Sequence, residues 1–206
     1  MDQNNAYDWV VDPHIVKIRV ERCRADARLP RYAHPGDAGM DIFAAEEALI
    51  PPGHTVLIPT GLKFAIPPGY ELQIRPRSGI SLKTALRIPN SPGTIDSGYR
   101  DELGIIYANT CLPPGISGID ALRELDKDYS SLPVCDLDNP FVGVPCVYRI
   151  RKGDRIAQML LAAVPAMEFV EVESVLGYGA DRHGGFGSSG TGDDGIASGK
   201  DNNDSE

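Results

Sequence analysis

The sequence places charged, polar or aromatic side chains beside glycine at three points outside the expected strands. The first is Pro76-Arg77-Ser78-Gly79, which puts a guanidinium, a hydroxyl and backbone amides together after a β-rich run. Arginine binds phosphate through paired hydrogen bonds, and successive backbone amides can form an anion-binding nest. Arg77, Ser78 and Gly79 are therefore candidates for binding a phosphate chain. Taken alone, the motif is equally well interpreted as an ordinary turn.

The second point is Asp96-Ser97-Gly98-Tyr99, between Gly93-Thr94-Ile95 and the apolar run 103–108. This setting predicts a β-hairpin. The end of a hairpin offers backbone donors and acceptors to the edge of a base, and Tyr99 offers a flat stacking surface. Asp96 is the candidate general base; a turn-capping aspartate is the alternative interpretation.

The third point is the stretch from Gly184 to Gly190, in which Phe186 is surrounded by glycine and serine. A single aromatic residue in such a stretch has no local core to join. We interpret it as a mobile arm that orders over a ligand, with Phe186 stacking and Arg182 supplying positive charge. The alternative is a flexible tail that carries one apolar residue.

Several other classes of protein are disfavoured. The only Gly-Lys pair, Gly199-Lys200, lacks the remaining residues of a P-loop. The four histidines form no HxxxH pattern and adjoin no cysteine pair, so a structural zinc site is not expected. A net charge of −9 disfavours nucleic acid as a partner. No apolar run is long enough to cross a membrane, and residues 1–12 lack a signal-peptide pattern, so a cytoplasmic location is expected.

Four widely spaced cysteines, Cys23, Cys111, Cys135 and Cys146, contain no CxxC pair. Reduced thiols are the expected state in a cytoplasmic protein. A disulfide such as Cys111–Cys135 stays open as an alternative.

The elements that must position these residues are expected to be strands. Residues 16–21 alternate strictly between apolar and polar side chains, as in a half-buried strand. Further β-rich runs, separated by Pro and Gly turns, lie at 55–58, 62–66, 70–75, 103–108, 146–150, 156–164 and 167–172. Many short strands with little helical periodicity predict an all-β sandwich, barrel or jelly roll.

The chain divides into several expected segments. Residues 1–15 form an N-terminal extension, and residues 16–176 form the β domain. Within that domain, residues 111–145 are an insertion whose apolar stripe at Ile119, Leu122 and Leu125 predicts a short helix capped by Ser117. Residues 177–190 are a mobile glycine-rich arm. Residues 191–206 carry five acids and one lysine and are expected to be disordered.

Taken in order, these pieces resemble the five short motifs of the trimeric dUTPase family. The match covers residues 16–190 apart from the insertion. The five motifs correspond to Ala38-Gly39-Met40-Asp41-Ile42 with Ala44-Ala45, to Pro76-Arg77-Ser78-Gly79, to residues 93–102 preceded by Asn90, to Gly153-Asp154-Arg155-Ile156-Ala157-Gln158, and to residues 182–190.

The resemblance implies a jelly-roll-like subunit, a homotrimer and active sites built between subunits. It implies Mg²⁺-assisted hydrolysis of dUTP to dUMP and pyrophosphate, which limits uracil incorporation into DNA and supplies dUMP for thymidylate synthesis. Asp96 then matches the residue that activates the attacking water, with Gln158 positioning that water. Tyr99 matches the residue that packs against deoxyribose, and Asp41 would hold Mg²⁺ through a water. The residues matched to substrate binding are Arg77, Ser78, Gly79, Asn90, Gly93, Ile95, Tyr99, Arg182, Phe186, Gly187, Ser188 and Ser189.

Three features depart from the family pattern. Asp101 stands where glycine is usual, only His183 separates Arg182 from Gly184, and the insertion is longer than the usual connection. Two alternatives remain beside the dUTPase interpretation. One is a dCTP deaminase of the same fold. The other is a dUTPase-like protein whose acidic insertion binds a regulatory protein. For the insertion itself, a flap that packs on its own subunit is the simpler hypothesis.

Overall fold

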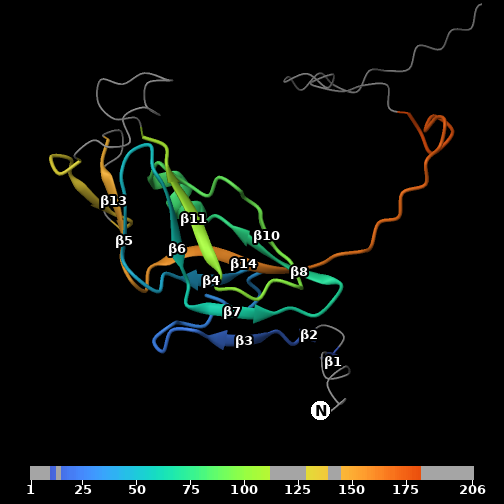
Figure 1. Cartoon of the computed structure of the whole chain (residues 1–206), viewed down its shortest axis with the longest axis horizontal. Helices are drawn as coiled ribbons and strands as arrows, with labels where there is room; N and C mark the ends of the chain where they lie inside the picture. The colour runs from blue at the N-terminus through green and yellow to red at the C-terminus, as the bar shows by residue number, and fades with distance from the viewer. Residues whose placement is uncertain (1–9, 13–14, 112–128, 139–144, 182–206) are drawn as a thin grey trace, which may run out of the picture. The chain divides into compact units, whose positions relative to one another are not determined.

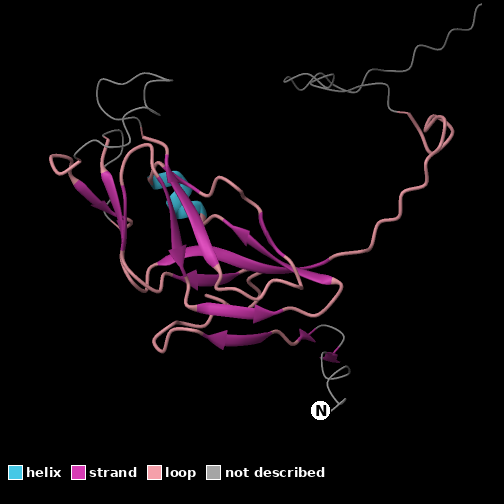
Figure 2. Ribbon diagram, viewed as in Figure 1, coloured by secondary structure: helices cyan, strands magenta, loops and turns pink. Residues whose placement is uncertain are grey.

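The computed structural model describes residues 10–12, 15–111, 129–138 and 145–181 of the 206-residue chain. Within these residues the chain forms short strands and one helix (Figures 1 and 2). The helix α1 spans Ser78–Lys83. The strands are β1 Val10–Asp12, β2 Ile15–Val16, β3 Arg19–Arg22, β4 Met40–Phe43, β5 Ala48–Ile50, β6 Thr55–Pro59, β7 Leu62–Ala65, β8 Tyr70–Arg75, β9 Leu86–Arg87, β10 Gly93–Ile95, β11 Gly104–Asn109, β12 Val134–Asp136, β13 Val147–Ile150 and β14 Arg155–Ala163.

The largest sheet has the strand order β10-β8-β14-β4, and all of its neighbouring strands are antiparallel. Its two central strands alternate between the core and the other face. In β8, Leu72 and Ile74 are buried, and in β14 Ala157 and Met159 are buried on either side of the partly exposed Gln158. This alternation is what a sheet with one face on the core requires. The β14 strand (orange in Figure 1) thus runs between β8 and β4.

Four smaller sheets complete the first compact unit, residues 1–166. Their strand orders are β6-β11-β9, β12-β13-β5, β3-β7 and β1-β2. Ile42, Ile58, Ile105 and Ile150 come from three different sheets and are at most 1 % exposed in a shared core. Each fully buried side chain of this size contributes roughly 1.5–3 kcal/mol through the hydrophobic effect. The packed sheets therefore hold the strand ends in fixed positions.

The predicted hairpin around residues 96–99 is wrong. β10 pairs with β8, whereas β11 pairs with β6 and β9, so the two strands belong to different sheets. The connecting residues 96–103 are long enough to cross between sheets. A two-residue turn would have kept the strands together.

Residues 76–79 do not form the ordinary turn that was the alternative interpretation of this motif. Ser78 begins α1, and the backbone amide of Ser81 donates to the carbonyl of Arg77 at 3.1 Å. At the other end, the backbone amide and the Oγ1 hydroxyl of Thr84 both donate to the carbonyl of Ile80, at 3.0 and 2.7 Å. Six residues are too few to show helical periodicity, which explains why the sequence did not indicate this helix.

The insertion contributes a strand at its C-terminal end. β12 pairs in parallel with β13, with Cys135 opposite Tyr148. Asp136 on β12 accepts two hydrogen bonds from Arg149 on β13, at 2.7 and 3.0 Å, so a charged contact reinforces the pairing. The helix predicted over residues 117–125 lies outside the described residues.

The second compact unit begins at Met167. Its described residues, 167–181, contain no strand, so the strand predicted at 167–172 is not found in the single chain. Met167, Phe169 and Val170 are 83 %, 89 % and 77 % exposed. The β-rich composition of residues 167–172 produced the strand prediction, but among the described residues of this unit no neighbouring strand pairs with them. Among the described residues, no helix is long and apolar enough to cross a membrane.

Candidate active site

Gln158 lies near the middle of the largest sheet, between two polar residues of neighbouring strands. Its partners in register are Asp41 on β4 and Arg75 on β8. Directly opposite residues project from the same face of a sheet, with Cβ atoms roughly 4.5–5.5 Å apart. The same face of the sheet therefore carries Asp41 of the first motif, Gln158 of the fourth, and Arg75, which precedes the second motif.

Asp41 is buried beneath two guanidinium groups. Its Oδ1 accepts a hydrogen bond from Nε of Arg77 at 3.1 Å, and its Oδ2 accepts one from Nη1 of Arg155 at 3.2 Å. The residue is 4 % exposed, whereas the Arg77 and Arg155 side chains are 25 % and 49 % exposed. Arg77 also donates from Nη1 to the Arg155 carbonyl at 3.5 Å. One buried carboxylate therefore orients two partly exposed cations toward solvent.

These groups line one cavity, and its walls are mostly polar. It is lined by Ala33, His34, Asp37, Ala38, Gly39, Asp41, Arg75, Arg77, Arg155, Gln158 and Leu160. Gly39 forms a tight part of the wall, because a Cβ atom there would lie 3.3 Å from the Cβ of Gln158 and 3.2 Å from the Leu160 side chain. Three arginines against two aspartates give the cavity an excess of positive charge on a chain of net charge −9. Such a cavity suits a polyanion.

A second group of candidates lies at the opposite edge of the same sheet. Gly93 and Ile95 belong to β10 and pair with Ile74 and Leu72 of β8. Asn90 lies beside Gly93, because a Cβ atom on Gly93 would be 3.3 Å from Nδ2 of Asn90. The Asn90 side chain therefore lies over the start of β10, where it and the strand backbone could read one edge of a base.

Asp96 and Tyr99 follow β10 in an exposed turn. The Tyr99 amide donates to the Asp96 carbonyl at 3.1 Å, which closes the turn. The Tyr99 hydroxyl donates to the Glu102 carbonyl at 3.0 Å, and 38 % of the tyrosine is exposed. An exposed carboxylate and an anchored aromatic ring thus lie within one turn. Asp101, the departure from the family pattern, is exposed on the same connection.

The two groups are separated within one chain. Ile95 is opposite Leu72 of β8, whereas Gln158 is opposite Arg75 of that strand. Three residues along β8 and two strand spacings across the sheet place Ile95 and Gln158 about 14 Å apart. No residue from 90 to 99 lines the cavity around Gln158 within the described part of the chain. Asp96 and Gln158 of the same chain are therefore too far apart to contact one water molecule.

Two arginines of the cavity were not singled out as site residues from the sequence. Arg75 ends β8 and adjoins the second motif. Arg155 begins β14 and falls within the fourth motif. Their exposure gives no periodic signal, but Arg155 could have been tested as an ion-pair partner of Asp41. Arg182, Phe186, Gly187, Ser188 and Ser189 lie outside the described residues.

The mainly antiparallel β unit and its positively charged, carboxylate-centred cavity define an all-β protein suited to a phosphorylated ligand. The sequence profile of the dUTPase family matches residues 25–111. A deoxyuridine 5′-triphosphate nucleotidohydrolase of Solibacter usitatus is 40 % identical over 177 residues, 85 % of this chain and 97 % of that protein. The enzyme of the same name from Clostridium tetani is 36 % identical over 84 % of this chain and 96 % of its own length.

Solved structures agree with these relatives. The dUTPase of Staphylococcus bacteriophage 80alpha with dUPNHPP has a TM-score of 0.66 and 32 % identity, covering 84 % of this chain and 98 % of that one. A point mutant of the dUTPase from phage phi11 of S. aureus, which coordinates a structural Mg(II) ion, has a TM-score of 0.61 and 30 % identity, covering 77 % and 97 %.

The chain belongs to the dUTPase family. The predicted family, the predicted all-β, jelly-roll-like subunit and the predicted nucleotidohydrolase class are confirmed. The dCTP deaminase alternative is not favoured, since the relatives are named for hydrolysis of the deoxyuridine triphosphate.

Proposed function

We propose that this protein hydrolyses dUTP to dUMP and pyrophosphate through attack of water on the α-phosphate. The observation that carries the proposal is the Asp41 carboxylate holding Arg77 and Arg155 in a cavity beside Gln158. A triphosphate is a polyanion, so attack on it depends on charge neutralisation and on the alignment of the nucleophile. Arginines oriented before the substrate arrives supply the first requirement.

The remaining roles follow the match of these residues to the motifs of the dUTPase family. Asp96 accepts the proton of the attacking water, and Gln158 orients that water against the phosphate. Ser78 and Gly79 contribute further donors to the phosphate chain. Tyr99 packs against the sugar, so a 2′-hydroxyl would collide with its ring. Asn90 and the backbone of Gly93 and Ile95 read the uracil edge.

Magnesium is the proposed cofactor, and the residues of the cavity fit a cation held mostly by the substrate. The described residues contain no group of three or more His, Cys, Asp or Glu that could hold a metal ion. Mg²⁺ is commonly bound by substrate phosphates and water with few protein ligands, and there it neutralises phosphate charge. Asp41 already accepts from two arginines, but each of its oxygens retains a lone pair for a water of the Mg²⁺ shell.

The site is proposed to be completed between subunits of a homotrimer. The Asp96 group and the Gln158 cavity lie at separate places in one chain, yet both are needed around one substrate. Cyclic symmetry would bring the Asp96 turn of one subunit to the cavity of another. The exposed Met167, Phe169 and Val170 favour a C-terminal segment that packs on a neighbouring subunit. The arm with Arg182, Phe186, Gly187, Ser188 and Ser189 would then close over base and γ-phosphate.

Product analysis tests the proposed reaction. With dUTP and Mg²⁺ the protein should release pyrophosphate and dUMP in equal amounts. With dCTP it should release no ammonia. Ammonia from dCTP, without pyrophosphate from dUTP, would identify a deaminase and overturn the proposal.

A regulatory partner at residues 111–145 stays a second hypothesis. Leu137 and Asp138 line a small polar cavity together with Arg77 and Arg155, so the C-terminal end of the insertion adjoins the proposed phosphate site. The pairing of β12 with β13 supports the view that this end packs on its own subunit. Residues 112–128, which carry the apolar stripe proposed to bind a partner, lie outside the described residues.

A further inference from the structure

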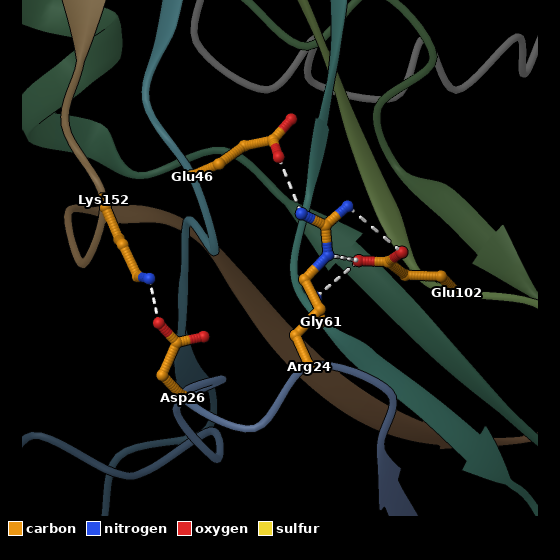
Figure 3. Close-up of polar contacts among 6 residues, drawn as sticks. All are labelled: Arg24, Asp26, Glu46, Gly61, Glu102 and Lys152. Atoms are coloured by element: carbon orange, nitrogen blue, oxygen red, sulfur yellow. Dashed lines mark hydrogen bonds and ion pairs between the residues drawn. The ribbon is translucent and has the colours of Figure 1, made fainter.

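Glu102 connects the Asp96–Tyr99 turn to a distant part of the chain. Its Oε1 accepts the backbone N–H of Gly61 at 2.7 Å and Nε of Arg24 at 3.1 Å (Figure 3). A second, longer contact of 3.5 Å joins Nη2 of Arg24 to Oε2. The Glu102 side chain is 29 % exposed, so these contacts are partly shielded from water. Arg24, Gly61 and Glu102 do not line the cavity of Gln158, and of the three only Glu102 belongs to one of the five motifs.

The partners of Glu102 are themselves held in place. Arg24 donates from Nη1 to Glu46 at 2.6 Å, so its guanidinium lies between two carboxylates (Figure 3). Gly61 has φ +73°, and a Cβ atom there would lie 2.6 Å from Cβ of Ala27. The backbone at Gly61 therefore has a conformation and a close packing that other residues would not tolerate. Glu102 is attached to a point that cannot easily move.

The backbone on either side of Glu102 carries this constraint to Tyr99. The Glu102 carbonyl accepts the Tyr99 hydroxyl at 3.0 Å. The next residue, Leu103, donates its amide to the Leu62 carbonyl at 2.8 Å, and its own carbonyl accepts the hydroxyl of Thr60 at 2.7 Å. The position of the tyrosine ring is thus determined at its outer end by the backbone of Glu102.

We propose that Glu102, held by Gly61 and Arg24, is a positioning residue that fixes the Tyr99 ring and thereby sets discrimination between deoxyribose and ribose. The inference rests on the proposed function. Rejection of a 2′-hydroxyl by shape requires a ring that cannot move away from the added oxygen. A ring hydrogen-bonded to a fixed carbonyl meets that requirement, whereas an exposed tyrosine without the contact would swing outward.

The test compares kcat/KM for dUTP with kcat/KM for UTP. In Glu102→Ala we expect the ratio of the two values to fall about tenfold, mainly because UTP becomes a better substrate. Glu102→Gln keeps an oxygen for the Gly61 amide and should restore the ratio to within about threefold of wild type. Asp26→Ala is the matched control, since the Asp26–Lys152 ion pair lies nearby in Figure 3 and Asp26 makes no hydrogen bond to Glu102 or Arg24, only a longer-range charge interaction with Arg24. It should leave the ratio unchanged.

A more conservative substitution tests the inference if Glu102→Ala does not fold. Tyr99→Phe removes only the hydroxyl and should lower the ratio by a similar factor. Where Glu102→Ala folds, its double variant with Tyr99→Phe should lower the ratio no further than Tyr99→Phe alone, because both changes act through one contact. An unchanged ratio in a folded Glu102→Ala chain, or in Tyr99→Phe, would overturn the inference. Absence of dUTP hydrolysis by the wild-type protein would instead refute the proposed function.

Discussion

The carboxylate of Asp41 and the guanidinium of Arg77 form a 3.1 Å ion pair in which the aspartate is almost fully buried and the arginine is partly exposed. Arg155 approaches the second carboxylate oxygen at 3.2 Å. The pair joins the first motif to the second, and through Arg155 to the fourth. Asp41 therefore has a structural task in the chain itself, beside the proposed contact to a water of Mg²⁺.

Replacing Asp41 with asparagine should weaken substrate binding and stability together. The Asp41→Asn chain loses the charge that orients two arginines, so we expect KM for dUTP to rise about tenfold. The free energy of unfolding should fall by about 2 kcal/mol, the range for hydrogen bonds to charged groups. Steady-state kinetics and urea unfolding measure the two effects.

Asp136 provides a matched control for this variant. It also pairs with two arginines, Arg149 and Arg151, but it does not line the cavity of Gln158. Asp136→Asn should lower stability and leave KM as in wild type. If both variants leave KM unchanged, Asp41 only stabilises the fold.

Replacing Asp96 with asparagine should abolish turnover without abolishing binding. The amide keeps the size of the side chain but cannot take up a proton, and general bases contribute roughly 10²–10⁴-fold to rate. We expect kcat to fall by at least about 100-fold, with the affinity for a non-hydrolysable imido analogue of dUTP retained. A wild-type kcat in the Asp96→Asn chain would reassign the base.

Two truncations should separate the arm from the tail. Deleting residues 191–206 removes an acidic segment without aromatic residues, and activity should stay near wild type. Ending the chain before Arg182 also removes Phe186, whose stacking on a base is worth roughly 1–3 kcal/mol. The shorter chain should therefore lose at least about fivefold in kcat/KM. Equal kinetics for the two truncated chains would show that the arm takes no part.

Alkaline pH should destabilise the fold through a buried tyrosine and thiol. Burial raises the pKa of Tyr148 to about 12, and it also raises the pKa of the Cys146 thiol. In the unfolded chain these groups ionise near pH 10 and about pH 8.5 respectively. The folded chain keeps protons that the unfolded chain loses in this range. The free energy of unfolding should thus be full below about pH 8.5 and decline as pH rises toward about 12.

Urea unfolding between about pH 8 and about pH 11 checks this expectation. Cys146→Ala removes one of the two groups and should show a shallower decline than wild type. Cys23 is an exposed thiol, so Cys23→Ala should follow the wild-type curve. A wild-type slope in Cys146→Ala would mean that the thiol does not contribute.

β8 and β14 lie within one residue of the β-rich runs from which they were predicted. The strictly alternating run 16–21, predicted to be one half-buried strand, is instead divided between β2 and β3, and all residues of β3 are exposed because it lies in the two-stranded sheet β3-β7. β4 was not expected, because Asp41, Ile42 and Phe43 are all buried and give no period of two. The hairpin at Asp96 failed for another reason, since local turn residues do not determine which sheet the following strand joins.

The candidate site was also predicted only in part from the sequence. Motif chemistry singled out Arg77, the resemblance to the family added Asp41 and Gln158, and the structure brings these three residues together in one cavity. The sequence did not indicate that Asp41 would be buried between two arginines, because ion pairing depends on register across β4 and β14. The separation of Asp96 from Gln158 is likewise a property of strand order, which short motifs do not encode.

The central claim is that one substrate is held by the Asp96 turn of one subunit and the Arg77 cavity of another. Mixing Asp96→Asn chains with Arg77→Ala chains and refolding them together tests it most directly. Each parent alone should have almost no activity. With random assembly, about one site in four would combine an intact Asp96 turn with an intact Arg77 cavity. Pyrophosphate release should therefore recover to about a quarter of the wild-type rate. Mixed assemblies as inactive as both parents would show that each site is built within a single chain.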